Sequence, residues 1–366
     1  MMKISNNENY FSEYVSATTA GSSNQTHLSC NGEIRTGRVY YKLSVGGTFD
    51  FSLLFSNTTD STFADGSYSV ANTVCDEWDI YSLKLGIVKS CKMDEPTDPE
   101  SFSQVYFGGK SKKTVGKGEI FSTDPCKLTF EKGDFLCVEI EFCGDMVPYH
   151  YELQIASFVK NGEVWVPSVQ TPLPSMVGIN RKAKNKIAYL GDSITQGIGA
   201  TKNAYRHWNA QLSNMLGDEN AYWNIGIGYA RAYDAASDGV WLYKAKQNDW
   251  VFLCLGVNDM GFGRNAEDIK NSLTRIVKIL KAEGIKVVIQ TAPPFDYSPE
   301  RKKIWECVNN YIRDTLSKEV DAYFDCVPVL GKSEDEPHIA RYGGHPNDDG
   351  CLAWAKALYE SVKNLF

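Results

Sequence analysis

The chain has 366 residues, of which 43% are hydrophobic and 23% are charged, as in an ordinary globular protein. Its formal net charge is −7 and it has no block of lysine and arginine, which argues against nucleic acid and anionic membranes as main partners. The first ten residues contain no apolar stretch of signal-peptide length, and no segment approaches the roughly 18 apolar residues of a membrane span, so we expect a cytoplasmic protein.

The first half of the chain predicts an all-β domain over residues 1–175, an antiparallel β-sandwich or jelly roll. Short segments rich in tyrosine, phenylalanine, valine, threonine and serine alternate apolar with polar residues, and glycine, asparagine and aspartate separate them. Clear examples are residues 38–45, 49–55, 127–130 and 135–142.

After a linker that contains Pro172, Pro174 and the basic stretch 181–186, strands alternate with helical periods. This alternation predicts an α/β domain over residues 183–366, with a parallel sheet covered on both faces. The predicted strands are residues 186–190, 222–227, 250–255 and 286–290, and the predicted helices are 266–282, 300–317 and 351–365. In open sheets of this kind, ligands bind beyond the carboxyl ends of the strands.

The motif Gly191-Asp-Ser-Ile-Thr-Gln-Gly197 directly follows the strand that ends at Leu190. A serine between a buried strand and a helix can project into a cleft as a nucleophile, while nearby backbone amides hold negative charge. A helix N-cap explains the same pattern, and the motif alone does not decide between the two interpretations. A Gly-x-Ser-x-Gly elbow is absent, so the common α/β-hydrolase type is not supported.

Two further motifs also follow predicted strands, Asn224-Ile-Gly-Ile-Gly-Tyr-Ala230 and Gly256-Val-Asn-Asp259. Glycines let the backbone approach a substrate, and the Asn258 amide can donate to an oxyanion. Taken singly, a tight turn explains the first motif better and an Asx-turn explains the second equally well. We expect Asp192 and Asp259 to brace these turns rather than to act chemically.

The motif His345-Pro-Asn-Asp-Asp-Gly350 precedes the last predicted helix. Among the five histidines, His345 is the best candidate for a general base, because the proline and the helix start hold its ring on a short loop. His338 is the second candidate. His207 is expected to be structural, and His27 and His150 belong to the β domain.

In this order and spacing, the four motifs resemble the SGNH (GDSL) hydrolase superfamily over residues 185–366. The resemblance implies a three-layer, flavodoxin-like α/β fold and a serine esterase with Ser193 as nucleophile and His345 as base. It also implies an oxyanion hole formed by the Ser193 amide, a glycine-block amide such as that of Gly228, and the Asn258 side chain. It implies neither a metal nor a cofactor.

Two positions depart from the family pattern. The family's acid lies three residues before the histidine, where this chain has Tyr342, so the acid comes from elsewhere or the enzyme works as a Ser–His dyad. Three acidic residues lie nearby in sequence, Glu334, Asp335 and Glu336. The family's glycine falls on Tyr229 when Asn224 is taken as the anchor, so the amide of Gly228 or of Tyr229 would serve the oxyanion.

A β-rich domain of about 170 residues ahead of such a domain is similar to carbohydrate esterase family two, some of whose members lack the acid. This resemblance implies an acetylated plant polysaccharide or oligosaccharide as the substrate, as for acetyl xylan esterases. Trp208, Trp241 and Trp305 lie near the motifs and are candidates for stacking on sugar faces. The oligomeric state is left open, a homo-oligomer included.

Other functions are kept as alternatives. One is an SGNH lipase, thioesterase or arylesterase, and another is a non-catalytic carbohydrate-binding protein in which Tyr342 marks a decayed site. The motif Gly109-Lys-Ser111 suggests a nucleotide-binding enzyme. This alternative is set aside because the Walker pattern needs a glycine at position 104, where the chain has Gln104. The ten irregularly spaced cysteines contain no Cys-x-x-Cys pair and are expected to be reduced core residues.

Overall fold

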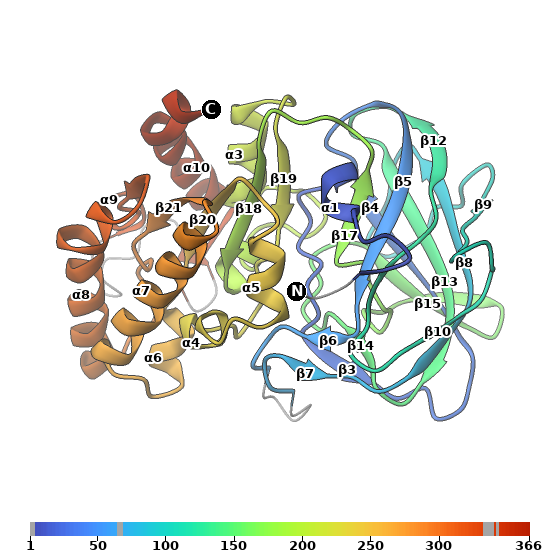
Figure 1. The fold of residues 1–366 in the computed structure, drawn as a ribbon, viewed down its shortest axis with the longest axis horizontal. Coiled ribbons are helices and arrows are strands. Elements are labelled where there is room, and N and C mark those ends of the chain that lie inside the picture. The colour runs from blue at the N-terminus through green and yellow to red at the C-terminus, as the bar shows by residue number, and fades with distance from the viewer. Residues whose placement is uncertain (1–3, 64–68, 332–339, 342–343) are drawn as a thin grey trace. The chain divides into compact units, whose positions relative to one another are not determined.

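The computed structural model describes residues 4–63, 69–331, 340–341 and 344–366. The chain divides into two compact units, residues 1–183 and 184–366. Figure 1 shows strands throughout the first unit and a mixture of strands and helices in the second. Strand β17 (Met176–Ile179) pairs within the first unit, which therefore continues past residue 175, the predicted end of the β domain.

Two larger sheets make up most of the first unit. One has the order β1 (Ile4–Ser5), β11 (Ile120–Ser122), β5 (Gly47–Ser56), β17 and β2 (Val15–Ser16), with β12 (Cys126–Phe130) also paired to β5. The other has the order β10 (Lys113–Val115), β8 (Trp78–Val88), β13 (Phe135–Gly144), β4 (Arg35–Lys42), β15 (Ser157–Asn161) and β16 (Val164–Pro167), with β9 (Ser103–Gln104) beside β8. Helix α1 (Tyr10–Glu13) and the strand pairs β3 (Thr26–Leu28) with β14 (Val147–Tyr149) and β6 (Thr58–Thr59) with β7 (Thr73–Val74) are shorter.

The strands of both larger sheets pair antiparallel except for β1 with β11. The central strand β4 is buried on both faces, because its successive residues Val39, Tyr40 and Tyr41 are all fully buried and successive side chains point to opposite faces. The segments predicted as strands around residues 40, 52, 128 and 138 form β4, β5, β12 and β13. The jelly-roll topology itself stays a prediction.

The second unit contains a parallel sheet, as predicted, with the order β19 (Ala221–Asn224), β18 (Lys186–Gly191), β20 (Trp250–Cys254), β21 (Lys286–Gln290) and β22 (Ala322–Phe324). Its helices are α2 (Ser193–Gln196), α3 (Trp208–Leu216), α4 (Ala232–Ala236), α5 (Val240–Ala245), α6 (Val257–Gly261), α7 (Ala266–Ala282), α8 (Pro299–Asp314), α9 (Val327–Leu330) and α10 (Asp348–Val362). Two further strands pair with each other, β23 (Ala340–Arg341) and β24 (His345–Pro346). Every residue of β20 is buried, so helices and loops cover both faces of the sheet.

Helix α7 shows how the sequence sets an element that packs on this sheet. Asn265 caps its first turn by accepting a hydrogen bond from the Asp268 N–H at 3.0 Å, and Asp268 accepts a bond from the Asn265 N–H in return. Ile269 and Leu273 fall on the buried face, and Gly284 ends the helix region with a φ of 76°. In Figure 1, α7 lies in front of β20 and β21.

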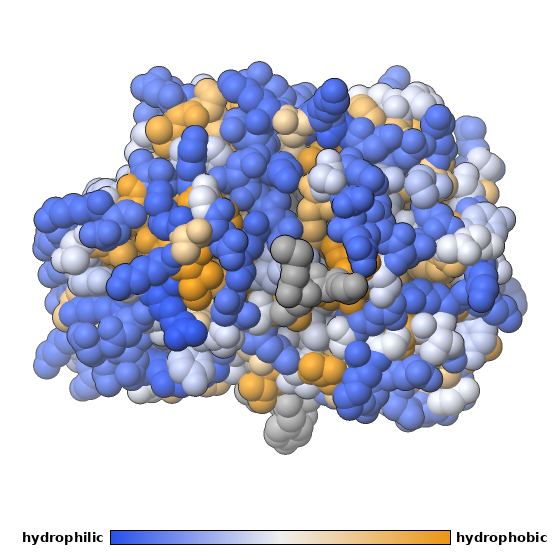
Figure 2. Space-filling model, viewed as in Figure 1, coloured by the Kyte–Doolittle hydropathy of each residue, from blue (hydrophilic) through white to orange (hydrophobic). Residues whose placement is uncertain are grey.

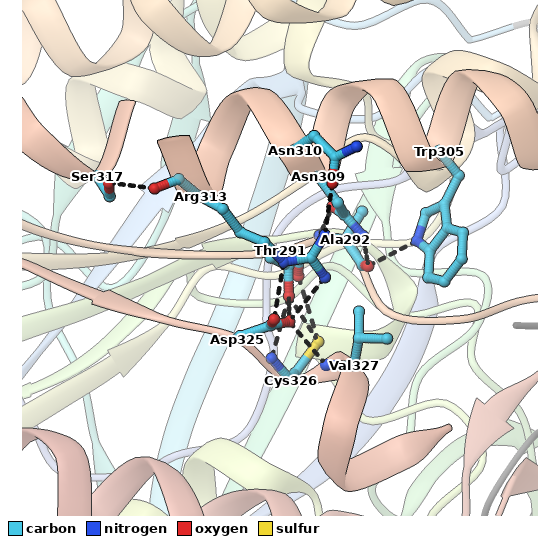
Figure 3. A network of polar contacts seen from close by, with 10 residues as sticks. All are labelled: Thr291, Ala292, Trp305, Asn309, Asn310, Arg313, Ser317, Asp325, Cys326 and Val327. Atoms are coloured by element: carbon cyan, nitrogen blue, oxygen red, sulfur yellow. Dashed lines mark hydrogen bonds and ion pairs between the residues drawn. The ribbon is translucent and has the colours of Figure 1, made fainter. Parts of the chain in front are cut away.

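A polar network fixes the chain where it leaves β21 (Figure 3). Thr291 donates its hydroxyl to Asp325 at 2.9 Å, just beyond the end of β22. Asn309 of α8 accepts a hydrogen bond from the N–H of Ala292 at 2.9 Å, and the indole of Trp305 donates to the Ala292 carbonyl at 2.8 Å. Because these groups are buried, the bonds hold the strand end against α8 and give the following loop a defined start.

Hydrophilic residues cover most of the face seen in Figure 2. Within the described part of the chain, every helix is too short or too polar to cross a bilayer.

Candidate active site

Ser193 is the first residue of helix α2, directly beyond the carboxyl end of β18. The carboxylate of Asp192 caps this helix by accepting a hydrogen bond from the N–H of Ile194 at 3.1 Å. The first N–H groups of a helix have no acceptor within it, so the amide of Ser193 can donate to a ligand. The serine side chain is half-buried, which leaves its hydroxyl open to a substrate.

His345 lies in β24, immediately before α10. Its Nε2 atom is 2.8 Å from the Oγ atom of Ser193, across 152 residues of sequence. This is hydrogen-bond distance, the geometry in which an imidazole can take the proton of an attacking hydroxyl. The structure therefore brings together the residues predicted as nucleophile and base, while their catalytic roles stay predictions.

Contacts from several segments hold the His345 ring in place. Phe295, in the loop after β21, meets the imidazole edge to face with ring centroids 4.9 Å apart and planes at 78°. A Cβ atom on Gly199 would lie 2.8 Å from the His345 Cβ, so only glycine fits there. Asp348 accepts hydrogen bonds from the N–H and hydroxyl of Thr201 at 2.6 and 2.7 Å, which ties the start of α10 to the segment after α2.

Asn258 lies on α6, which follows β20 after Gly256, a residue with a φ of 129°. Its side-chain amide donates to the carbonyl of Ala230 at 3.0 Å. An asparagine amide carries two N–H groups, so this bond orients the group and leaves the second N–H for an oxyanion. The same bond connects α6 to the glycine block.

The glycine block packs closely against α2. A Cβ atom on Gly226 would lie 2.6 Å from the backbone nitrogen of Gln196, an approach that excludes any larger residue. The Gly228 N–H donates to Oε1 of Gln196 at 2.6 Å, so this amide already has an acceptor within the protein. Tyr229 has a φ of 64°, the left-handed conformation that favours glycine, at the position where the family pattern has glycine.

Asp192 and Asp259 brace the site, as expected. Asp259 accepts hydrogen bonds from the N–H groups of Ala232 and Tyr233 at 2.8 and 3.1 Å, and so caps α4. Burial raises the pKa of Asp259 to about 6 and that of Asp192 to about 7, although backbone hydrogen bonds oppose both shifts. Each carboxylate fixes the turn that carries a neighbouring site residue.

Two asparagines for which no role was predicted complete the support. The Asn209 side chain donates to the carbonyl of Thr195 at 2.5 Å, and that of Asn224 donates to the same carbonyl at 3.1 Å. Asn224 also accepts a hydrogen bond from the N–H of Gly226 at 3.0 Å. These bonds join α3, the end of β19 and α2. Their only local signal is a polar residue inside an apolar stretch, because the partners are distant in sequence.

The predicted acid position and its alternatives lie outside the described residues. They are Tyr342, Glu334, Asp335 and Glu336, together with the second candidate base His338. The choice between a catalytic triad and a dyad therefore stays a prediction.

Trp208, Trp241 and Trp305 are excluded as candidates for stacking on sugars, because all three are at most 3% exposed. The indole N–H of Trp241 donates to the carbonyl of Ile225 at 2.8 Å, and Trp305 is held on Ala292 as described above. Trp208 stacks on Trp354 with centroids 5.2 Å apart. These three tryptophans fill the core behind the sheet edge instead of lining the site.

The described residues contain no cluster of three or more histidine, cysteine, aspartate or glutamate side chains placed to hold a metal ion. Seven of the ten cysteines are buried, Cys91 and Cys143 are partly buried, and Cys307 is exposed. Burial raises the pKa of Cys254, which lies near the site, well above its ordinary value.

Residues 189–352 match the model of the GDSL-like lipase/acylhydrolase family. This segment contains Ser193, Asn258 and His345, and its similarity to that family supports a carboxylic ester hydrolase.

Several solved structures are also similar to the chain. The psychrotrophic esterase EstA from Pseudoalteromonas sp. is 20% identical, covers 50% of this chain and 98% of its own, and gives a TM-score of 0.40. A lipolytic protein of the G-D-S-L family from Veillonella parvula is 20% identical over 48% and 96%, with a TM-score of 0.42. A carbohydrate esterase of family 3 from Talaromyces cellulolyticus is 25% identical over 49% and 97%, with a TM-score of 0.40. No curated protein matches the chain.

Proposed function

We propose that this protein is a serine esterase that removes acetyl groups from acetylated carbohydrate through an acyl-enzyme. The hydrogen bond of 2.8 Å between Ser193 Oγ and His345 Nε2 supports the proposal, because it joins a hydroxyl and an imidazole at the edge of a parallel sheet where ligands bind in such folds. The family match over residues 189–352 supports ester hydrolysis as the reaction class.

In the first half of the reaction, Ser193 attacks the acyl carbonyl while His345 takes the hydroxyl proton. The imidazolium then gives this proton to the leaving alcohol oxygen, which departs as the deacylated sugar. In the second half, His345 takes a proton from water, the water attacks the acyl-enzyme, and the acid is released as the serine proton is restored.

The oxyanion of each tetrahedral intermediate is held by the Ser193 amide, the second N–H of Asn258 and one amide of the glycine block. We assign this last amide to Tyr229 rather than Gly228. The Gly228 N–H is occupied by Gln196 at 2.6 Å, whereas Tyr229 has the backbone conformation of a glycine at the matching position.

The dyad form of the mechanism is supported by Tyr342, which stands where the family has its acid. An acid normally orients the imidazole and stabilises its charged form. Here the edge contact with Phe295 orients the ring by apolar packing, and the hydrogen bonds from Thr201 to Asp348 anchor the start of α10.

The proposal of an acetylated carbohydrate as the substrate rests on the order of the two domains and on Tyr342. An N-terminal unit dominated by β-sheets precedes the catalytic unit, which is the organisation of carbohydrate esterase family two. Longer acyl esters, thioesters and aryl esters are the alternatives within the same catalytic family.

The test compares hydrolysis of 4-nitrophenyl acetate, acetylated xylo-oligosaccharide, an octanoyl ester and an acyl thioester. We expect the highest kcat/KM on the acetylated oligosaccharide and loss of turnover on all four in Ser193→Ala. A phosphonate ester should add covalently to Ser193, as read by peptide mass spectrometry. Turnover that survives in Ser193→Ala would overturn the esterase assignment, and a wild-type protein inactive on every ester would favour the carbohydrate-binding alternative.

A further inference from the structure

Two exposed aromatic rings and two arginines form one surface group in the second unit. Tyr233, on α4, is 47% exposed, and Phe262, the residue after α6, is 41% exposed. The Arg264 guanidinium lies 3.8 Å from the ring centroid of Tyr233, and that of Arg231 lies 5.2 Å from Tyr233 and 5.1 Å from Phe262. These four residues are termed the arginine–aromatic cluster.

The cluster is built on the backbone that positions the oxyanion residue. The Phe262 N–H donates to the carbonyl of Asn258, and the Arg264 N–H donates to the carbonyl of Asp259, both at 2.9 Å. The Asp259 carboxylate in turn accepts from the N–H of Tyr233. In Figure 1, α4 and α6 lie at the same end of the sheet. The cluster is therefore connected by backbone hydrogen bonds to the segment that carries Asn258, and we expect one ligand to contact both.

A hollow adjoins Tyr233 between α4 and α7. Its volume is about 320 Å³, at the lower end of the range of about 300–1,000 Å³ for small-molecule sites. Its lining contains a third arginine and several small polar side chains: Tyr233, Ala236, Ser237, Asn271, Ser272 and Arg275.

The charges of these arginines are unequally compensated. Arg231 is held by Asp234 through two hydrogen bonds of 3.0 and 2.7 Å. Arg264 and Arg275 form no ion pair with any residue that the structure describes, although the chain as a whole carries a net charge of −7. A planar guanidinium binds a carboxylate through two parallel hydrogen bonds.

The acidic residues nearby are already engaged. Asp268, in the first turn of α7, accepts a hydrogen bond from the N–H of Asn265 in a capping box, and Glu267 lies 3.9 Å from the ammonium group of Lys270. The exposed parts of Tyr233 and Phe262 add an apolar surface beside the cations, which suits a ring that presents C–H groups and carries a carboxylate. A uronic acid residue has this combination.

We propose that the arginine–aromatic cluster binds a uronic acid side group of the carbohydrate acceptor, so that the enzyme prefers acidic acetylated oligosaccharides to neutral ones. This inference rests on the proposed function for its substrate class. The exposed edges of Tyr233 and Phe262 contact the sugar ring, and Arg264 pairs with the carboxylate, while the acetyl ester of a neighbouring sugar lies at Ser193.

The test measures kcat and KM on an acetylated xylo-oligosaccharide with a glucuronic acid branch, on the unbranched acetylated oligosaccharide and on 4-nitrophenyl acetate. For the wild type we expect a KM about fivefold lower on the branched substrate, the effect of one exposed ion pair. Arg264→Gln should abolish this difference, Arg264→Lys should keep part of it, and neither should change kcat on 4-nitrophenyl acetate. Salt at about 0.5 M should reduce the preference because it screens exposed charges.

Lys278→Gln is the matched control, because it removes one exposed positive charge from α7 outside the cluster. It should leave the preference unchanged. Equal KM values on branched and unbranched substrates in the wild type, or a preference that survives in Arg264→Gln, would overturn the inference.

A binding measurement separates this inference from the esterase assignment. Calorimetry with Ser193→Ala and the non-acetylated branched oligosaccharide should show binding about fivefold tighter than with the unbranched one. Such a preference in a protein that hydrolyses no ester would support the uronic acid site and contradict the esterase assignment. Ester hydrolysis without any preference for the acidic oligosaccharide would support the esterase assignment and contradict the uronic acid site.

Discussion

Glu139 in the first unit and the two buried aspartates beside Ser193 in the second are compensated in different ways. In the first unit, Glu139 accepts hydrogen bonds from Arg38 at 2.7 Å and Lys84 at 3.1 Å, so cations compensate its charge. In the second unit, Asp192 and Asp259 accept hydrogen bonds from backbone N–H groups. A cation stabilises a buried carboxylate where it stands, whereas a backbone N–H also fixes the conformation of a loop. The second arrangement is the one found around Ser193.

Two asparagines show the same contrast. Asn57, fully buried in the first unit, donates to carbonyls that include that of Gly116 at 2.8 Å, and it accepts from the indole of Trp78 at 2.9 Å. Asn258, half-buried in the second unit, donates to Ala230 and retains an N–H for a ligand. Burial of a polar group therefore does not mark a functional site. The feature that we expect to mark a functional site is a hydrogen-bond donor left unused at a sheet edge.

Loss of the base should produce the largest difference between the units. His345→Ala should lower kcat at least about 10⁴-fold, because the nucleophile then has no group to take its proton. His150→Gln, at a buried histidine of the first unit that bonds the Ser23 carbonyl, should lower stability and leave kcat unchanged. Steady-state kinetics and urea unfolding of both variants check this. An active His345→Ala enzyme would contradict the role of His345.

The asparagine pair should give the next largest effect. Asn258→Ala should lower kcat by about 10²- to 10³-fold with little change in KM, because the donor acts on the transition state. Asn57→Ala should lower the free energy of unfolding by about 2 kcal/mol, because buried partners lose their hydrogen bonds, and should not change kcat. The contrast fails if both variants lose activity to the same extent.

The ion pair of the first unit should matter for stability alone. Arg38→Met leaves Glu139 buried without its closest cation and should lower the free energy of unfolding by about 3 kcal/mol. Chemical denaturation measures this loss, and kcat on 4-nitrophenyl acetate should stay at the wild-type value in the folded variant. The double variant Arg38→Met, Glu139→Leu should recover most of the stability, which a purely steric effect of the introduced methionine would not allow.

The smallest expected effect concerns pH. Burial raises the pKa of Asp192 to about 7 in the folded state, above its unfolded value, so ionisation of Asp192 costs stability as the pH rises. In Asp192→Asn the introduced amide does not ionise, yet its oxygen still accepts the bond from the N–H of Ile194. Between roughly pH 5 and pH 8, the wild type should lose about 2 kcal/mol of unfolding free energy relative to Asp192→Asn. Urea denaturation at both pH values tests this, and parallel curves would show that Asp192 does not titrate in this range.

The sequence predicts the regular parts of the catalytic unit well because their signals are local. The apolar period of α7 and its caps give the observed bounds 266–282, and four apolar runs give β18 to β21. Strand β22 was not predicted, since three residues of strand show no periodicity.

The residues of the candidate site also fall into those that the sequence predicts and those that it does not. Ser193 and His345 follow from ordered motifs, and the structure brings them to hydrogen-bond distance. Gln196, which bonds the Gly228 amide, and Phe295, which packs on the imidazole, carry no sequence signal because long-range folding creates these contacts. Three tryptophans were candidates only by nearness in sequence to the motifs, and this nearness does not tell which side of the sheet a ring faces.

The hydrogen bond between Ser193 and His345 closes a loop of 152 residues that spans most of the second unit. Contacts with so large a sequence separation form slowly, since the chain between them must first be ordered. Esterase activity is therefore a reporter of completed folding, and we expect it to return after the helices have formed when the denatured protein is diluted into buffer.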